Sequence, residues 1–126
     1  MAFEVKGGVE YQKYDRVFWY KMFDFIQKTW KTGKIEFKGN KQCYWTIYYK
    51  IKKNIIVCKA QMIDRKGKKK EKELYYAIYD PQRKNWRIRY HKFKGDRKKY
   101  WRLSYEIKNY LVIWKANKIN NDYLKI

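Results

Sequence analysis

Short apolar runs alternate with polar, basic connectors along most of the chain, from Lys41 onward. The runs are rich in aromatic and β-branched side chains, which fit the pleated surface of a sheet. Their regular spacing is typical of strands joined by short turns. The chain's one proline, Pro81, lies between two runs, where a missing backbone donor costs nothing. The pattern predicts a meandering antiparallel sheet, with strands at CYWTIYYKI, NIIVCKAQMID, ELYYAIYD, NWRIRYHKF, YWRLSY and YLVIWK.

Period-two alternation is clearest in the run NWRIRYHKF. Successive side chains of a strand point to opposite faces of the sheet, so one face of this run is expected to be core and the other wet, with Arg87, Arg89 and His91 on the wet side. In CYWTIYYKI both faces are aromatic, so its orientation stays open. The same rule assigns one set of alternating side chains to the interior: Ile56, Cys58, Met62, Trp86, Ile88, Tyr90, Trp101, Leu103 and Tyr105.

The first forty residues are less regular. The stretch YDRVFWYKMFDFIQKTW fits either an amphipathic helix or a strand followed by a long loop, and apolar spacing does not decide between them. Six or seven antiparallel strands with short connections predict an all-β fold, either an up-and-down barrel or a sandwich. A chain of 126 residues is the size of a single domain, so we expect one domain over residues 1–126.

The charge balance is the most unusual feature of the composition. Lysine and arginine number 33 against 12 acidic residues, for a net charge of +21. An AT-rich genome would inflate lysine together with Ile, Asn and Tyr, but it does not explain so few carboxylates. A field of this sign attracts polyanions, because basic side chains release the counterions that a polyanion condenses. The composition therefore favours an anionic partner.

The start of the chain, MAFEVKGG, contains no apolar segment typical of a signal peptide, and no stretch approaches the length of a membrane-spanning helix. We therefore expect the protein inside a cell or a virus particle. Cys43 and Cys58 make no disulfide framework, and their spacing matches no paired metal-ligand motif. On a hairpin turning near Lys53, Cys43 would face about position 62 rather than 58. Both thiols are expected to be free.

Catalytic patterns are missing from the sequence. His91 is the only histidine, and local spacing places no carboxylate near it. The chain has no metal-ligand spacing, no glycine-rich phosphate loop and no Gly-x-Ser-x-Gly elbow. The sequence therefore predicts a protein that is not an enzyme and uses no cofactor or metal.

The segment YWRLSYEIKNYLVIW resembles the late strand pair of the lipocalins, above all the apolipoprotein D and bacterial lipocalin branch. Glu106, Asn109 and Tyr110 stand where that branch carries an acidic residue followed by an NYALV-like run. KYDRVFWYK is similar to the first family motif, with Trp19 and Tyr20 matching and Val17 in place of glycine. KQCYWTIYY resembles the second strand, and DPQRKNWRIRYHKF the turn and fifth strand.

The resemblance covers roughly residues 11 to 117 and implies a lipocalin-like (calycin) barrel with Trp19 also in its interior. A short helix near the N-terminus remains possible. The family's closing strand, its motif arginine and its C-terminal helix have no counterpart in ANKINNDYLKI, so the resemblance is to a barrel truncated at the C-terminus. Also missing are the family's signal peptide and the usual disulfide partner of Cys43.

In a lipocalin-like barrel the loops after the first, third and fifth strands share the open mouth. Here they correspond to residues 25–42, DRKGKKKEKE and HKFKGDRKK. Lysines there would act as point charges toward phosphate, and arginines as bidentate donors. The expected anion-binding residues of this mouth are Lys28, Lys31, Lys34, Lys38, Lys41, Arg65, Lys66, Lys68, Lys69, Lys70, Lys72, Lys92, Lys94, Arg97, Lys98 and Lys99.

Blander interpretations of the lysine run are a solvated hairpin tip near Gly67 that discourages edge pairing, or a nuclear-localisation signal. The leading functional hypothesis is a structural or binding protein that docks onto an anionic partner in a nucleic-acid-containing assembly, a virion or a ribonucleoprotein, beside neighbouring protein chains. One alternative is a small carrier for a hydrophobic ligand with an anionic head group. A second is direct single-strand binding, in which exposed aromatic rings stack on bases.

Overall fold

The computed structural model describes residues 2–96 and 98–120, with only the backbone described at residues 69 and 70. Antiparallel strands account for almost all of this part of the chain. They are β1 (Phe3–Gln12), β2 (Asp15–Asp24), β3 (Thr29–Phe37), β4 (Cys43–Lys52), β5 (Ile55–Asp64), β6 (Lys69–Asp80), β7 (Asn85–Lys94), β8 (Lys99–Lys108) and β9 (Leu111–Asn120).

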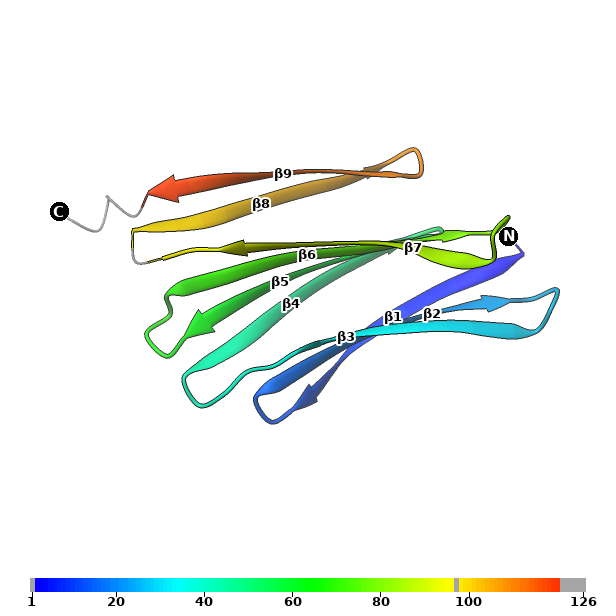
Figure 1. The fold of residues 1–126 in the computed structure, drawn as a ribbon. Coiled ribbons are helices and arrows are strands. Elements are labelled where there is room, and N and C mark those ends of the chain that lie inside the picture. Colours follow the sequence, from blue (N-terminus) through cyan, green and yellow to red (C-terminus); the bar gives the residue numbers. More distant parts are fainter. Residues whose placement is uncertain (1, 97, 121–126) are drawn as a thin grey trace.

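The strands form three sheets, each a meander in which neighbours in sequence are neighbours in space. We call them the N-terminal sheet (β1–β3), the central sheet (β4–β7) and the C-terminal hairpin (β8–β9). Figure 1 shows the N-terminal sheet below the central sheet and the C-terminal hairpin above it. The all-β antiparallel meander predicted from the sequence is confirmed.

The prediction that the sheet closes into a barrel is not confirmed. The described strands form no closed barrel, because the strand ladder is interrupted between β3 and β4 and again between β7 and β8. At these two connectors the chain leaves one sheet and starts the next. Apolar surface is therefore buried by stacking sheets face to face, the other common solution for amphipathic antiparallel strands.

The central sheet is buried on both of its faces along β5. Four consecutive residues there, Ile55 to Cys58, have at most 1% of their surface exposed. Because successive side chains alternate between faces, such an uninterrupted buried run requires cover on both sides. The two core clusters of the described residues separate accordingly.

The first cluster fills the space between the N-terminal and central sheets. Phe18, Tyr20 and Phe37 from the N-terminal sheet pack against Ile56, Cys58, Ala60, Tyr75 and Ala77 from the central sheet. The second cluster lies on the other face, where Ile55, Val57 and Leu74 pack against Leu103 of the C-terminal hairpin, with Phe93, Tyr105 and Trp114 partly buried around them.

The predicted interior residues divide between these two cores. Ile56, Cys58, Met62 and Trp86 pack in the first, and Leu103 and Tyr105 in the second. Trp101 is half-buried, with its ring centroid 5.2 Å from that of Phe93.

Three interior assignments are wrong or only partly right. Ile88 and Tyr90 share the predicted face, but 44% and 36% of their surfaces are exposed, because β7 is an edge strand of the central sheet. Trp19 alternates with buried Phe18 and Tyr20, so it lies on the outer face of the N-terminal sheet. A Cβ added at Gly8 would come within 2.7 Å of the Trp19 ring, so the indole lies directly on this glycine.

The face expected to be wet on β7 is partly covered. The His91 ring centroid lies 4.5 Å from that of Trp114, and Phe93 also contacts Trp114. Alternation separated the two faces of β7 correctly, but it could not indicate that a second sheet would cover the more polar one.

The possible N-terminal helix is not formed, since residues 15–24 are strand β2 and the described residues contain no helix. Burial follows a period of two from Phe18 to Met22, where Phe18, Tyr20 and Met22 are buried and the two residues between them are less so. The expected long loop over residues 25–42 is also wrong, because β3 occupies half of it. No described helix is long and apolar enough to cross a membrane.

Aspartates begin several of the turns and bind backbone amides there. Asp24 accepts hydrogen bonds from the amides of Ile26 and Gln27, and Asp80 accepts them from Gln82 and Arg83. Each four-residue turn then ends at a lysine with positive φ, Lys28 or Lys84. The repeated pattern Asp-x-x-x-Lys therefore fixes these turns locally, as expected for aspartate side chains at turn starts.

A glycine in β3 allows a hydrogen bond across the first core. The ring of Tyr20 lies over Gly33, and the Tyr20 hydroxyl is 2.5 Å from the hydroxyl of Tyr75. A Cβ at position 33 would overlap that ring. The ring cannot easily move, because Tyr20 is buried and also packs edge-on against Trp86.

The substitution Gly33→Ala is therefore expected to lower the free energy of unfolding by about 1–3 kcal/mol, the usual cost of overpacking. Urea unfolding with circular dichroism measures it. In a Tyr20→Leu background the same change should cost clearly less, because the ring is gone. Equal costs in the two backgrounds would contradict this account of Gly33.

Candidate polyanion-binding end

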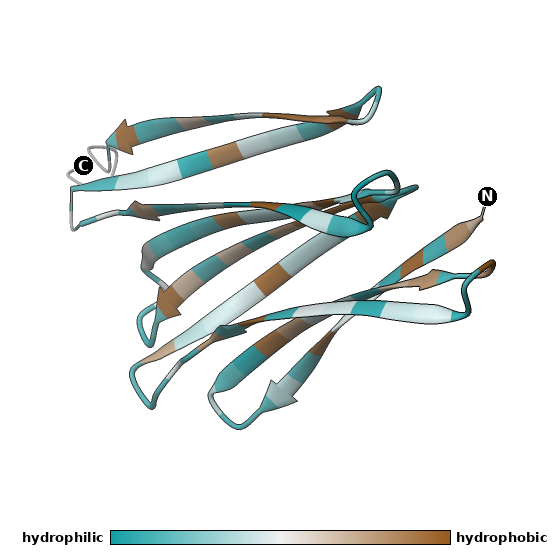
Figure 2. Ribbon diagram, turned by 45° about the vertical axis from the view of Figure 1, so that its right-hand side comes forward, coloured by the Kyte–Doolittle hydropathy of each residue, from teal (hydrophilic) through white to brown (hydrophobic). Residues whose placement is uncertain are grey.

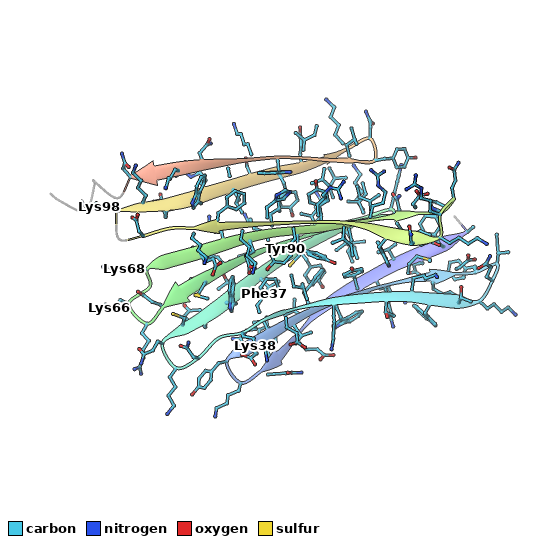
Figure 3. All side chains as sticks on the ribbon, viewed as in Figure 1. Phe37, Lys38, Lys66, Lys68, Tyr90 and Lys98 are labelled. Atoms are coloured by element: carbon cyan, nitrogen blue, oxygen red, sulfur yellow. The ribbon has the colours of Figure 1, made fainter. Side chains whose placement is uncertain are left out.

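Connectors from all three sheets meet at one end of the stack. Because each strand runs antiparallel to the one before it, the connectors 38–42 and 65–68 and the described residues between β7 and β8 project from the same end. The connectors 38–42 and 65–68 are joined by a hydrogen bond from the Arg65 amide to the Gln42 carbonyl. We call the exposed basic residues of these three connectors, together with Lys99 at the start of β8, the basic end; they are Lys38, Lys41, Arg65, Lys66, Lys68, Lys98 and Lys99. Figure 3 shows Lys66, Lys68 and Lys98 at this edge of the molecule, with Lys38 farther inward.

The three predicted mouth loops therefore share one end only in part. Lys28 lies in the turn between β2 and β3, at the opposite end. Lys31 and Lys34 lie within β3, and Lys72, Lys92 and Lys94 lie within β6 and β7 rather than in loops. Arg97 and the side chains of residues 69 and 70 lie outside what the structure describes.

Carboxylates at the basic end are bound to backbone amides. Asp64 accepts hydrogen bonds from the amides of Lys66 and Lys68, and Asp96 accepts them from Lys98 and Lys99. The two bonds to Asp96 hold its pKa below the usual value. Within residues 2–96 and 98–120, no ion pair joins a member of the basic end to a carboxylate. The aspartates thus stabilise the turns by binding backbone amides, while the lysines remain exposed to solvent.

Exposed tyrosines lie on β4, beside this end. Tyr44, Thr46 and Tyr48 alternate onto the face of the central sheet away from the N-terminal sheet. Exposed fractions are 43% for Tyr44 and 62% for Tyr48, and the Nζ of Lys59 lies 6.0 Å from the Tyr48 ring centroid. Aromatic rings interleaved with cations are what base stacking beside phosphate binding requires. Alternation in CYWTIYYKI was enough to place Tyr44 and Tyr48 on one face. It could not show that this face stays exposed to solvent.

A second cluster of polar groups lies inside the first core. Glu73 is 4% exposed and accepts a hydrogen bond from the hydroxyl of Tyr90, while the Nζ of Lys92 lies 3.7 Å from its Oε1. Burial raises the pKa of Glu73 above the usual range, partly offset by Tyr90 and Lys92. Cys58 lies on the same face and is buried, which raises its pKa as well.

Two hydrogen-bonded pairs are joined here by ring packing, Glu73 with Tyr90 and Tyr75 with Tyr20. The rings of Tyr90 and Tyr75 pack edge-on, and the hydroxyls of Tyr75 and Tyr20 share a hydrogen bond. Among the described residues, no group of three or more His, Cys, Asp and Glu side chains could hold a metal ion. Both thiols are free, as predicted, although Cys43 pairs in register with Asp64 rather than with position 62.

Comparison with protein-family models, curated proteins and solved structures gave no match to this chain. The resemblance to the lipocalins therefore stays a prediction.

The buried Glu73 predicts a pH dependence of stability. Because its pKa is raised in the folded protein, protonation contributes stability that is fully present below the usual glutamate value of about 4.3 and is lost as the pH rises through the raised value. Glu73→Gln keeps an acceptor for Tyr90 and removes the ionisation. Relative to wild type, this variant should gain free energy of unfolding as the pH rises from acidic to neutral.

Urea unfolding at a series of pH values measures this difference, with Glu106→Gln on the exposed face of the C-terminal hairpin as the control. The control should show no comparable trend. A difference for Glu73→Gln that is constant across the series would argue against a raised pKa.

Proposed function

We propose that this protein is a non-enzymatic docking protein whose basic end binds a polyanion, with nucleic acid as the favoured partner. It would serve as a structural or binding component of a nucleic-acid-containing assembly, such as a virion or a ribonucleoprotein, inside a cell or a virus particle. The observation that carries the proposal is the gathering of lysines from three separate connectors at one end, where the aspartates bind backbone amides.

Phosphate chemistry fits this arrangement. Each lysine that neutralises a phosphate releases condensed counterions, so several lysines close together give strong, salt-sensitive binding. Turn-borne Lys66, Lys68 and Lys98 are exposed on connectors whose backbones are fixed by aspartate hydrogen bonds. Binding through these lysines therefore loses little backbone entropy, because the connectors are already ordered.

The tyrosines of β4 favour single-stranded nucleic acid as the form of the partner. Tyr44 lies next to the connector 38–42, and Tyr48 lies farther along the same face of β4. A strand whose phosphates lie on Lys41 and Arg65 could stack bases on these rings. The carrier for a hydrophobic ligand with an anionic head group remains the alternative.

Replacing four lysines of the basic end, Lys38, Lys66, Lys68 and Lys98, by Gln should weaken binding to single-stranded DNA. Each lost phosphate contact lowers the slope of log affinity against log salt by about 0.7. Fluorescence anisotropy at several salt concentrations measures both quantities.

The matched control replaces Lys28, Lys52, Lys84 and Lys108 by Gln, at the opposite end of the stack. Both variants lose the same net charge. The control should retain most of the affinity and the slope. Equal losses in the two variants would mean that overall charge, not the basic end, attracts nucleic acid.

Stacking is tested by Tyr48→Leu, which keeps an apolar side chain but removes the flat ring. Loss of one stacked base costs about 1–3 kcal/mol, so affinity for single-stranded DNA should fall by about fivefold or more. Tyr110→Leu is the control, because Tyr110 is also 62% exposed and also lies beneath a lysine, Lys53. Unchanged affinity in Tyr48→Leu would exclude stacking there.

A further inference from the structure

The end opposite the basic end carries exposed apolar side chains at a hairpin tip. The turn between β2 and β3 exposes 49% of Phe25 and 78% of Ile26, and Trp30 at the start of β3 is also 49% exposed. Figure 2 shows hydrophobic colour at this tip, whereas the connectors of the basic end are hydrophilic. Leu111 and Tyr110, at the tip of the C-terminal hairpin, reach the same end and are 61% and 62% exposed.

The tip between β2 and β3 is held in one conformation. Asp24 accepts hydrogen bonds from the amides of Ile26 and Gln27, and the Phe25 amide donates to the Ala2 carbonyl. These bonds hold the backbone of the turn in which Phe25 and Ile26 are exposed.

Aromatic rings continue from the tip onto the outer face of the N-terminal sheet. The ring centroid of Phe23 lies 5.1 Å from Phe25 and 4.6 Å from Trp30. These rings support one another, so Trp30 stands as a fixed, half-exposed indole behind the tip. Indoles prefer the level of lipid head groups in a bilayer, where one side is apolar and the other wet.

Lysines surround this apolar tip. The Nζ of Lys21 lies 4.5 Å from the Trp30 ring centroid and 5.5 Å from that of Trp19. Lys28 ends the turn and Lys31 follows in β3, and both are exposed. The carboxylate of the turn, Asp24, is bound to backbone amides. The charge around the tip therefore complements an anionic surface.

We propose that the tip between β2 and β3 inserts into the interface of a lipid bilayer that contains anionic lipids. Phe25 and Ile26 enter the boundary of the acyl chains, Trp30 lies at the head groups, and Lys21, Lys28 and Lys31 bind lipid phosphates. A protruding, rigid apolar tip suits a fluid surface that closes around it. This inference does not depend on the proposed function, since it involves the other end of the stack.

The experiment measures cosedimentation with vesicles made of equal parts phosphatidylcholine and phosphatidylserine. The double variant Phe25→Ser, Ile26→Ser keeps the net charge, so any loss of binding is not electrostatic. Removing the two apolar side chains that enter the bilayer should lower vesicle affinity about tenfold or more. Tyr11→Ser is the control, because Tyr11 is 74% exposed near the turn at the other end of β1 and should not matter.

Wild type should also bind these vesicles better than vesicles of phosphatidylcholine alone. The double variant should unfold at the wild-type urea concentration and bind single-stranded DNA as wild type does, which separates this inference from the nucleic-acid proposal. Wild-type vesicle affinity in the double variant would overturn the inference. So would a wild-type dimer that the double variant converts to a monomer, because the tip would then contact a second copy.

Discussion

Burial of the central sheet on both faces is the constraint on which the rest of the structure depends. Ile55 and Val57 point to one side of β5, and Ile56 and Cys58 to the other, and all four are buried. Fully burying such aliphatic side chains contributes about 1.5–3 kcal/mol each, but only if another layer covers them. The N-terminal sheet and the C-terminal hairpin provide those layers. Stacking in this way leaves most polar residues on the outer faces and at the two ends of the molecule, with Phe25 and Ile26 as exposed apolar exceptions at one end.

Stacking also decides where the charge is found. The strands are of nearly equal length and antiparallel, so alternate connectors project from opposite ends. Lysines in connectors far apart in the sequence therefore lie at one end. The aspartates that could neutralise them, Asp64 and Asp96, instead close the turns through backbone amides. Local turn chemistry and long-range charge are thus linked through the same side chains.

The two ends differ in chemistry, which supports different partners. One presents lysines on polar turns, with tyrosines of β4 beside them. The other presents Phe25 and Ile26 on a rigid tip with lysines around it. The two proposals, taken together, would have one end bind a polyanion and the other an anionic lipid surface.

The sequence alone determined the strands from residue 43 onward, their antiparallel order, both free thiols and the turn near Pro81. Alternation and turn residues are local signals, so they are sufficient for these features. It also placed Trp86 and Cys58 in the core. Strand β1 was not predicted, and a strand over residues 15–24 was only one of two alternatives left open, because mixed aromatic spacing fits more than one period.

Tertiary structure alone decided which faces are covered. Alternation says which side chains share a face, but it does not say what lies against that face. The resemblance to the lipocalins assigned Trp19 to an interior that it faces away from, and alternation assigned Ile88 to a core that covers only part of the edge strand β7. Lys28 was grouped with Lys38 because strand β3 was not predicted; β3 lies between them and carries the chain from one end of the stack to the other. Sheet stacking depends on contacts between distant residues, and no local pattern contains that information.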